Sequence, residues 1–232
     1  MADFMTTRGM LARCLATENL LVEHDNTADT ASFNTETRVL TLPMLQTKSE
    51  YVYNLFVAHE VGHALWTPTH WQDSIPNNVP FDFVNVVEDA RIERMIQNKY
   101  PGIRKDFSKG YDDLNDQDFF GTKDQDYSKL PLIDRINLHF KLGARALMPF
   151  SPEEFDFVRD IEGCDNFADV CAVSKKLADF VNAKANNKTP DVEMPSTNSG
   201  KSQQSSQMNS DDTSESRPGD TDENETQSTE TG

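Results

Sequence analysis

The sequence predicts an α+β fold, in which a small antiparallel sheet precedes a mostly helical body. Before residue 43, short apolar runs alternate with turn residues, which is typical of strands joined by tight loops. After residue 49, apolar residues recur at helical spacing over longer stretches, and prolines separate these stretches. From residue 186 onward the chain is mostly polar, and such a composition cannot bury enough apolar surface to offset the entropy of ordering.

The first part of the chain is expected to supply one helix and the sheet. Met5 to Ala16 has apolar positions at helical spacing, and Leu20 to Val22 is a short apolar run that favours a strand. Two extended pieces, at 31–33 and 38–42, flank the polar loop 34–37 and predict a β-hairpin. These strands together make the small antiparallel sheet.

The second part of the chain is predicted to be helical apart from one long loop. A helix that begins near Glu50, with Ser49 as its N-cap, must stop near Pro68, because proline lacks the amide proton that a helix interior needs. A long loop is expected from Ser108 to Ser128, which is polar and rich in Asp and aromatic residues. The other predicted helices cover 80–100, 131–147, 152–162 and 167–183.

Composition divides the chain into a folded domain, 1–185, and an acidic low-complexity tail, 186–232, which is predicted to be disordered. The formal net charge is -17. The tail carries ten Asp or Glu and three Lys or Arg, so the domain remains strongly acidic, which argues against nucleic acid or an anionic membrane as a partner. A solvating linker, a tether to a further domain and a docking segment for a protein partner all fit the tail.

The cysteines and the N-terminus both favour the cytoplasm. Cys14, Cys164 and Cys171 are odd in number, and their spacing matches no disulfide or zinc framework, which predicts buried thiols in a reducing compartment. The chain shows neither the pattern of a signal peptide nor a run of about eighteen apolar residues, the length that would predict a membrane span. We therefore expect a soluble cytoplasmic protein.

One motif on the first long helix carries recognisable chemistry. His59-Glu60-Val61-Gly62-His63 has the pattern H-E-x-x-H. Residues four apart lie on the same helical face, so both imidazoles can reach one metal ion. Glu60 lies about 100° around the helix from His59 and should approach a water on the metal, where a general base must sit. Gly62 permits a neighbouring element to come close, and the apolar surroundings make unpaired His and Glu side chains costly.

The motif and its surroundings resemble the zincin metallopeptidases. Phe56 to Leu65 is uncharged at every position except the His-Glu and His of the motif, which is similar to the extended zincin signature. The strand Arg38 to Leu42 precedes the motif helix, and in that family the strand beside this helix lines the substrate cleft. The resemblance implies a zincin-like domain with one Zn²⁺ per chain and a peptide or protein substrate.

The expected zinc site needs a third protein ligand and an open position. His70 misses the third histidine of the metzincin pattern by one position, because Thr69 stands there and Trp66 replaces the turning glycine. Glu88 is the better candidate, since the gluzincin branch of the family draws a glutamate from the helix after the motif helix. Glu88 falls on the apolar face of that helix, and the alternative is an ion pair with Arg91 on a solvated face.

Four other residues are candidates for supporting roles. Asp89 or Glu93 could accept a hydrogen bond from a ligand imidazole and fix its tautomer. His70 and Tyr111 are candidate donors to an oxyanion, with plainer alternatives as ordinary loop residues. In an active site of this kind, zinc lowers the pKa of a bound water to about 7, Glu60 takes the proton, and the hydroxide attacks a peptide carbonyl.

A second resemblance suggests a different function. The run from Val87 to Glu93 also looks like metallopeptidase-like domains upstream of von Willebrand A domains, as in cobaltochelatase-type subunits, where an acidic segment can link the two parts. This implies a zinc-binding but non-proteolytic module in a larger complex with a von Willebrand A or ATPase partner. A metal-free acidic interaction protein is the remaining alternative. Two imidazoles and a carboxylate suit zinc without excluding other divalent ions.

Overall fold

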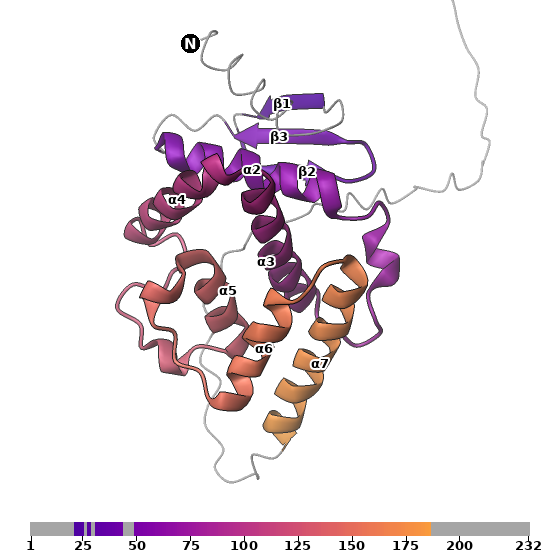
Figure 1. Ribbon diagram of the computed structural model, residues 1–232, viewed down its shortest axis with the longest axis vertical. Coiled ribbons are helices and arrows are strands. Elements are labelled where there is room, and N and C mark those ends of the chain that lie inside the picture. Colours follow the sequence, from indigo (N-terminus) through magenta and orange to yellow (C-terminus); the bar gives the residue numbers. More distant parts are fainter. Residues whose placement is uncertain (1–20, 26, 29–30, 44–48, 187–232) are drawn as a thin grey trace, which may run out of the picture.

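The computed structural model describes residues 21–25, 27–28, 31–43 and 49–186. A three-stranded sheet lies at one end of a group of helices (Figure 1), which confirms the predicted α+β fold. None of the helices in these ranges is long and apolar enough to cross a membrane. The helix predicted at 5–16, Cys14 and all but the first residue of the predicted tail lie outside the described residues.

The sheet is mixed, and the prediction of a purely antiparallel sheet was wrong. β2 (Ser32–Asn34) and β3 (Val39–Pro43) pair antiparallel, which confirms the predicted hairpin. β1 (Leu21–Asp25) pairs with β3 in parallel, so the strand order is β1-β3-β2. β3 is the central strand, and its Leu40 and Leu42 are fully buried. The alternation in a short strand identifies its buried face but does not set the direction of its neighbour.

The motif helix is α2 (Glu50–Trp66), and it has the predicted bounds. Ser49 caps its N-terminus by accepting a hydrogen bond from an amide of the first turn. At the other end the amide of Thr67 donates to the carbonyl oxygen of His63 at 2.9 Å. Every residue in 57–64 is buried. α2 therefore runs through the interior and carries the whole H-E-x-x-H motif with it.

A helix occupies the first part of the segment that was predicted to be a long loop. α4 (Arg104–Asp116) follows the short turn η2 (Pro101–Ile103) and packs on α2. The loop prediction was wrong because the apolar stripe of α4 is narrow and the rest of its surface is polar. Further along, the chain forms turns and the short η3 (Tyr127–Lys129). The buried residues of α4 recur at i, i+3, i+4 and i+7: Phe107, Gly110, Tyr111 and Leu114.

The remaining helices gather around α3 (Phe81–Lys99), which follows the short η1 (Trp71–Ser74). α5 (Leu132–Leu142) is shorter than the predicted helix 131–147. It ends before Gly143, whose φ of 74° is left-handed, and the turn η4 (Ala144–Ala146) follows. Buried Cys164 and Cys171 are free thiols, as predicted. Three helices pack on α3: α5 (Leu132–Leu142), α6 (Pro152–Glu162) and α7 (Phe167–Asn186).

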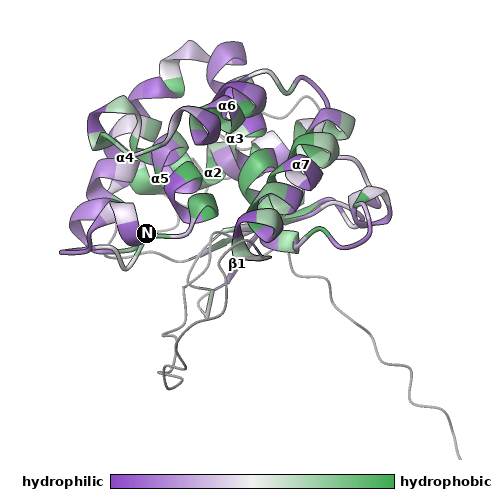
Figure 2. Cartoon of the chain, turned by 90° about the horizontal axis from the view of Figure 1, so that it is seen from below, coloured by the Kyte–Doolittle hydropathy of each residue, from purple (hydrophilic) through white to green (hydrophobic). Residues whose placement is uncertain are grey.

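Two hydrophobic cores stabilise the domain. One lies mainly between the sheet, α2 and α4, and the other between α3, α5, α6 and α7. In Figure 2 the hydrophobic residues lie largely on the sides of the helices that face the middle of the molecule. α2 and α3 pack against each other. Polar side chains on their facing sides are therefore kept from water and must find partners within the protein.

Candidate metal centre

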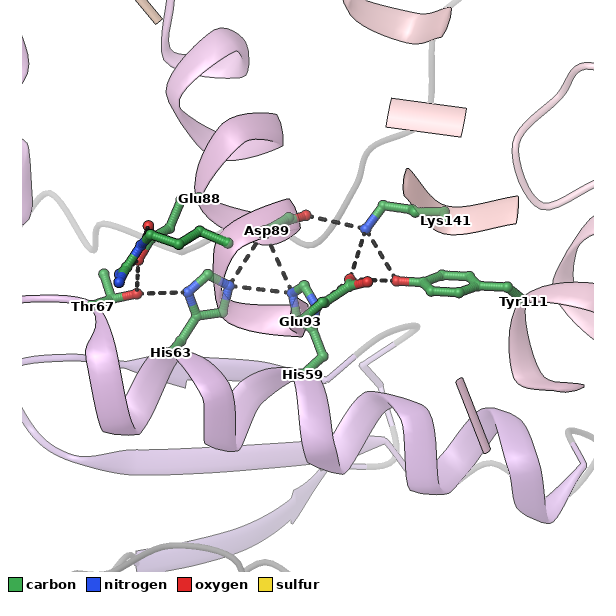
Figure 3. A network of polar contacts seen from close by, with 9 residues as sticks. His59, His63, Thr67, Glu88, Asp89, Glu93, Tyr111 and Lys141 are labelled. Carbon is green, nitrogen blue, oxygen red and sulfur yellow. Dashed lines mark hydrogen bonds and ion pairs between the residues drawn. The ribbon is translucent and has the colours of Figure 1, made fainter. Parts of the chain in front are cut away.

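Three side chains on α2 and α3 converge on one point (Figure 3). His59 and His63 lie one turn apart on α2, and Asp89 faces them from α3. The two histidine Nε2 atoms are 3.2 Å apart. Asp89 Oδ1 lies 3.6 Å from Nε2 of His59 and 3.4 Å from Nε2 of His63. Within the described residues, this is the one group of three His, Cys, Asp or Glu side chains placed to share an ion, and all three are buried.

Gly62 allows α3 to come close to α2 at this point. A Cβ atom on Gly62 would lie 2.8 Å from Cδ1 of Ile92 and 3.5 Å from the carbonyl oxygen of Ile92. A side chain at position 62 would require the end of the Ile92 side chain to move, while the backbone of α3 would stay at ordinary van der Waals distance. Because Asp89 lies about one turn before Ile92, the close approach brings its carboxylate to the two imidazoles.

Glu93 orients the imidazole of His59. Its Oε1 lies 2.9 Å from His59 Nδ1. A carboxylate only accepts hydrogen bonds, so Nδ1 carries a proton and Nε2 is directed at the shared point. The same oxygen accepts hydrogen bonds from the Tyr111 hydroxyl and from Lys141 Nζ, the latter at 3.1 Å. Of the two residues expected to hold a ligand imidazole, Glu93 is therefore the one placed to do so. Tyr111, an expected oxyanion donor, is instead hydrogen-bonded to Glu93.

His63 is held on its other side by a residue that the motif did not reveal. Thr67 Oγ1 lies 2.9 Å from His63 Nδ1 and donates to Glu88 Oε1 at 2.5 Å. Arg91 in turn binds Glu88 with two hydrogen bonds, of 2.8 and 2.7 Å. Thr67 follows His63 by four residues and so continues the same helical face, which is the signal in the sequence that could have identified it.

Asp89 occupies the position that was predicted for Glu88. The carboxylate of Glu88 lies beyond Thr67, on the Nδ1 side of His63, and forms an ion pair with Arg91. This ion pair was the alternative expectation, but it is buried instead of solvated, with both side chains no more than 3% exposed. Neighbouring helical residues point about 100° apart, so the rotation of α3 about its axis decides which carboxylate meets the histidines. That rotation depends on tertiary packing.

His70 lies on the surface, which agrees with its poor match to the metzincin ligand position and does not support the oxyanion-donor role suggested for it. Its side chain is 66% exposed, and Nδ1 lies 3.3 Å from Glu36 Oε1 in the hairpin loop. The residue has a left-handed backbone, with φ of 59°, immediately before η1. It lies outside the group formed by His59, His63 and Asp89.

No family model matches this chain, and neither does any curated protein or solved structure. The resemblance to zincins therefore stays a prediction. The geometry and charge of the cluster are the evidence from which its function can be inferred.

The buried charges of the cluster leave an excess of negative charge. Glu60, Asp89 and Glu93 are three buried carboxylic acids, each no more than 4% exposed. Lys141, from α5, is the cation placed among them, with Nζ 3.3 Å from Asp89 Oδ2 and 3.1 Å from Glu93 Oε1. The ion pair between Glu88 and Arg91 is neutral by itself. With all three acids ionised and both imidazoles neutral, the formal charge is two negative units, which one divalent cation would neutralise.

The pKa values of the buried histidine and acids also show that this site stabilises positive charge. Burial lowers the pKa of His59, but Asp89, the hydrogen bond to Glu93 and the charge of Glu60 outweigh it and raise this pKa to about 9. Burial opposes ionisation of Asp89 and Glu93, yet Lys141 and His59 hold both pKa values below the usual range. The pKa of Glu60 is raised, mainly by burial. A proton is therefore bound tightly at this point when no metal competes for it.

Replacing Lys141 with methionine is expected to destabilise the metal-free protein by about 3–5 kcal/mol, because Asp89 and Glu93 would remain buried without their shared cation. Chemical denaturation followed by circular dichroism measures this free energy of unfolding. Lys129→Met is the matched control: its side chain is 82% exposed, so its ion pair with Asp126 contributes about 1 kcal/mol or less. Equal stabilities of the two variants would show that Lys141 does not compensate these carboxylates.

Proposed function

We propose that this protein binds one zinc ion through His59, His63 and Asp89 and hydrolyses amide bonds in peptides, with Glu60 as the general base. The observation that carries the proposal is the convergence of three buried acceptor atoms on one point. Nδ1 of each histidine is occupied by a hydrogen bond, so Nε2 is the atom each presents to Asp89 Oδ1. Within the described residues, no hydrogen-bond donor of good geometry meets that oxygen. In the metal-free protein a proton on the imidazoles can satisfy such a group of atoms, and a bound metal ion would take the place of that proton.

The spacing of these atoms supports zinc. Nitrogen and oxygen ligands 2.0–2.2 Å from a tetrahedral zinc lie about 3.3–3.6 Å from one another. The three distances of the cluster are 3.2, 3.4 and 3.6 Å. Two neutral imidazoles and one carboxylate are also a common ligand set for a catalytic zinc, which uses three protein ligands and leaves a fourth position for water or substrate.

The position of Glu60 supports a hydrolytic role. A bound zinc ion would supply Lewis-acid chemistry and acidify a bound water to a pKa of about 7. Glu60 follows His59 on α2 and is close enough to both histidines and Asp89 for their charges to affect its pKa. Its own pKa is raised, which brings a carboxylate closer to the range in which it can accept a proton and later return it. The proton would pass from water to Glu60 and then to the leaving amine.

Burial of the cluster favours a second candidate, a zinc-binding module without proteolytic activity. His59, His63 and Asp89 are between 2% and 4% exposed. A surface pocket of about 280 Å³ is lined by Glu93 together with Arg94 and Phe140, so it reaches the outer side of the network and not the three ligand residues. Burial from solvent fits a structural zinc better than a catalytic one, and a structural zinc usually has a fourth protein ligand in place of water. In that case the protein would act within a larger complex.

Metal content and hydrolysis together test the proposal. Protein purified without chelators or affinity nickel is expected to carry about one zinc per chain by plasma mass spectrometry, and the loaded protein is expected to cleave members of a peptide library. Zinc without cleavage would favour the non-proteolytic module. No metal binding, even after reconstitution with zinc, would overturn both candidates and favour a metal-free interaction protein.

A further inference from the structure

We infer that Thr67 is a positioning residue, which fixes the tautomer of His63 through a buried chain of hydrogen bonds from Arg91 and Glu88. The inference rests on the proposed metal site, because it concerns which nitrogen of His63 is available to the ion. Figure 3 shows the chain of contacts on the side of His63 that faces away from Asp89. Its three hydrogen-bonding residues are all buried, with exposed fractions of 5% for Thr67 and 2% for Glu88 and Arg91.

The direction of each hydrogen bond in this chain follows from what each group can donate. The guanidinium of Arg91 only donates, and it binds both oxygens of Glu88, at 2.8 and 2.7 Å. The ionised carboxylate of Glu88 only accepts, so the 2.5 Å contact with Thr67 Oγ1 uses the proton of the hydroxyl. A hydroxyl has one proton. Towards His63 Nδ1, at 2.9 Å, Thr67 can therefore only accept.

The consequence for His63 is a single tautomer. Nδ1 must carry the proton that Thr67 accepts, and the lone pair is then on Nε2, the atom that faces His59 and Asp89. Burial is essential to this effect, because a water molecule could donate as well as accept and would leave both tautomers available. The charge of Arg91 thus sets, through two intervening side chains, which nitrogen is offered to a metal.

The chain of hydrogen bonds is attached to the end of α2, which holds it in place. The amide of Thr67 donates to the carbonyl oxygen of His63 at 2.9 Å. Arg91 Nη2 donates to the carbonyl oxygen of Trp66 at 3.1 Å. The last turn of α2 and the middle of α3 are therefore joined by the same residues that orient His63. His59 is different, since a carboxylate, Glu93, contacts its Nδ1 directly.

Thr67→Val tests the inference, because valine keeps the shape of threonine and lacks the hydroxyl. In the metal-free wild type, two-bond ¹H–¹⁵N correlation spectra of the imidazoles are expected to show the Nδ1–H tautomer of His63. In Thr67→Val the Nε2–H tautomer is expected to gain population, and zinc affinity is expected to fall about 10–100-fold. Thr67→Ser should restore both properties. Thr35→Val, at another buried threonine, is the matched control and should change neither.

Glu88→Gln provides an independent test, because it keeps the Thr67 hydroxyl and changes the group that accepts its hydrogen bond. Arg91 contacts both oxygens of Glu88, and Thr67 contacts Oε1, so in glutamine one of these positions becomes an NH₂ group that cannot accept. Where the NH₂ group takes the position of Oε1, Thr67 accepts from it and donates to His63 Nδ1, so the Nε2–H tautomer is expected to gain population. A folded Thr67→Val protein that retains the wild-type tautomer and affinity would overturn the inference, as would failure of Thr67→Ser to restore them. If Thr67→Val does not fold, the spectrum of Thr67→Ala, which also lacks the hydroxyl, decides.

The two proposals fail in different ways. A wild-type protein that binds no zinc would remove the proposed function, while the tautomer of His63 in the metal-free protein would still be measured. Zinc binding with a His63 tautomer that is insensitive to both substitutions would retain the metal site and remove the role of Thr67.

Discussion

Asp89→Asn is expected to reduce zinc affinity by more than about 100-fold. Removing a residue that only hydrogen-bonds a metal ligand costs about 10–100-fold, and weakening a ligand itself should cost more. The substitution keeps the size of the side chain and removes the negative charge from the oxygen that lies 3.4 and 3.6 Å from the two Nε2 atoms. Competition with a chromophoric chelator measures the affinity. Because ligands that bind only the native state stabilise it, the zinc-dependent increase in the melting temperature should disappear as well.

Two control variants make this result specific. Asp116→Asn, at the exposed C-terminal end of α4, should bind zinc like the wild type. Glu88→Gln should lose no more than about 10–100-fold, because it changes the hydrogen bonding of Thr67 and His63 and removes no ligand atom. If Glu88→Gln lost far more affinity than Asp89→Asn, Glu88 would be the third ligand, as the gluzincin resemblance implies, and α3 would have to be rotated relative to this structure.

The parts of the site that could be predicted from sequence are those fixed by helix geometry alone. The spacing of His59, Glu60 and His63 determines their relative positions on α2 wherever that helix packs. Its N-cap and the proline beyond its end are local signals too, and the helix has the predicted bounds. The acidic run on the next helix was also recognised as part of the site. The gluzincin resemblance favoured Glu88 over Asp89, but the residues themselves do not separate the two, because both are buried and only the packing of α3 distinguishes them.

Contacts between distant segments were not predictable in this way. Lys141 reaches Asp89 across 52 positions, from a helix whose sequence shows a lysine between Phe140 and Leu142 and nothing that identifies its partner. Tyr111 was placed in a loop, because α4 has only a narrow apolar stripe. The parallel pairing of β1 with β3 likewise depends on the path of the chain in three dimensions. These are the same long-range contacts that supply the charge balance of the site.

Glu60→Gln is expected to reduce peptide hydrolysis by about 10²–10⁴-fold while zinc binding stays close to that of the wild type. Glutamine has nearly the same shape as glutamate but cannot accept a proton from water, so the loss should appear in kcat with little change in KM. Initial rates on the best substrate from a peptide library, together with zinc content, measure the effect. Glu50→Gln, in the exposed first turn of α2, is the matched control and should keep full activity.

The pH dependence of the wild type offers a second observation on the same residue. A base works only when ionised, so the rate should fall as the pH decreases through the pKa of Glu60, which burial raises above its usual value. Burial moves the acidic limb to higher pH than for an ordinary glutamate, and the positive charge of a bound zinc ion would move it back towards lower pH. A Glu60→Gln variant that retains zinc and full activity would assign the base to another group. An inactive but zinc-loaded wild type would instead leave Glu60 as one of the three buried acids that balance the charge of a structural ion.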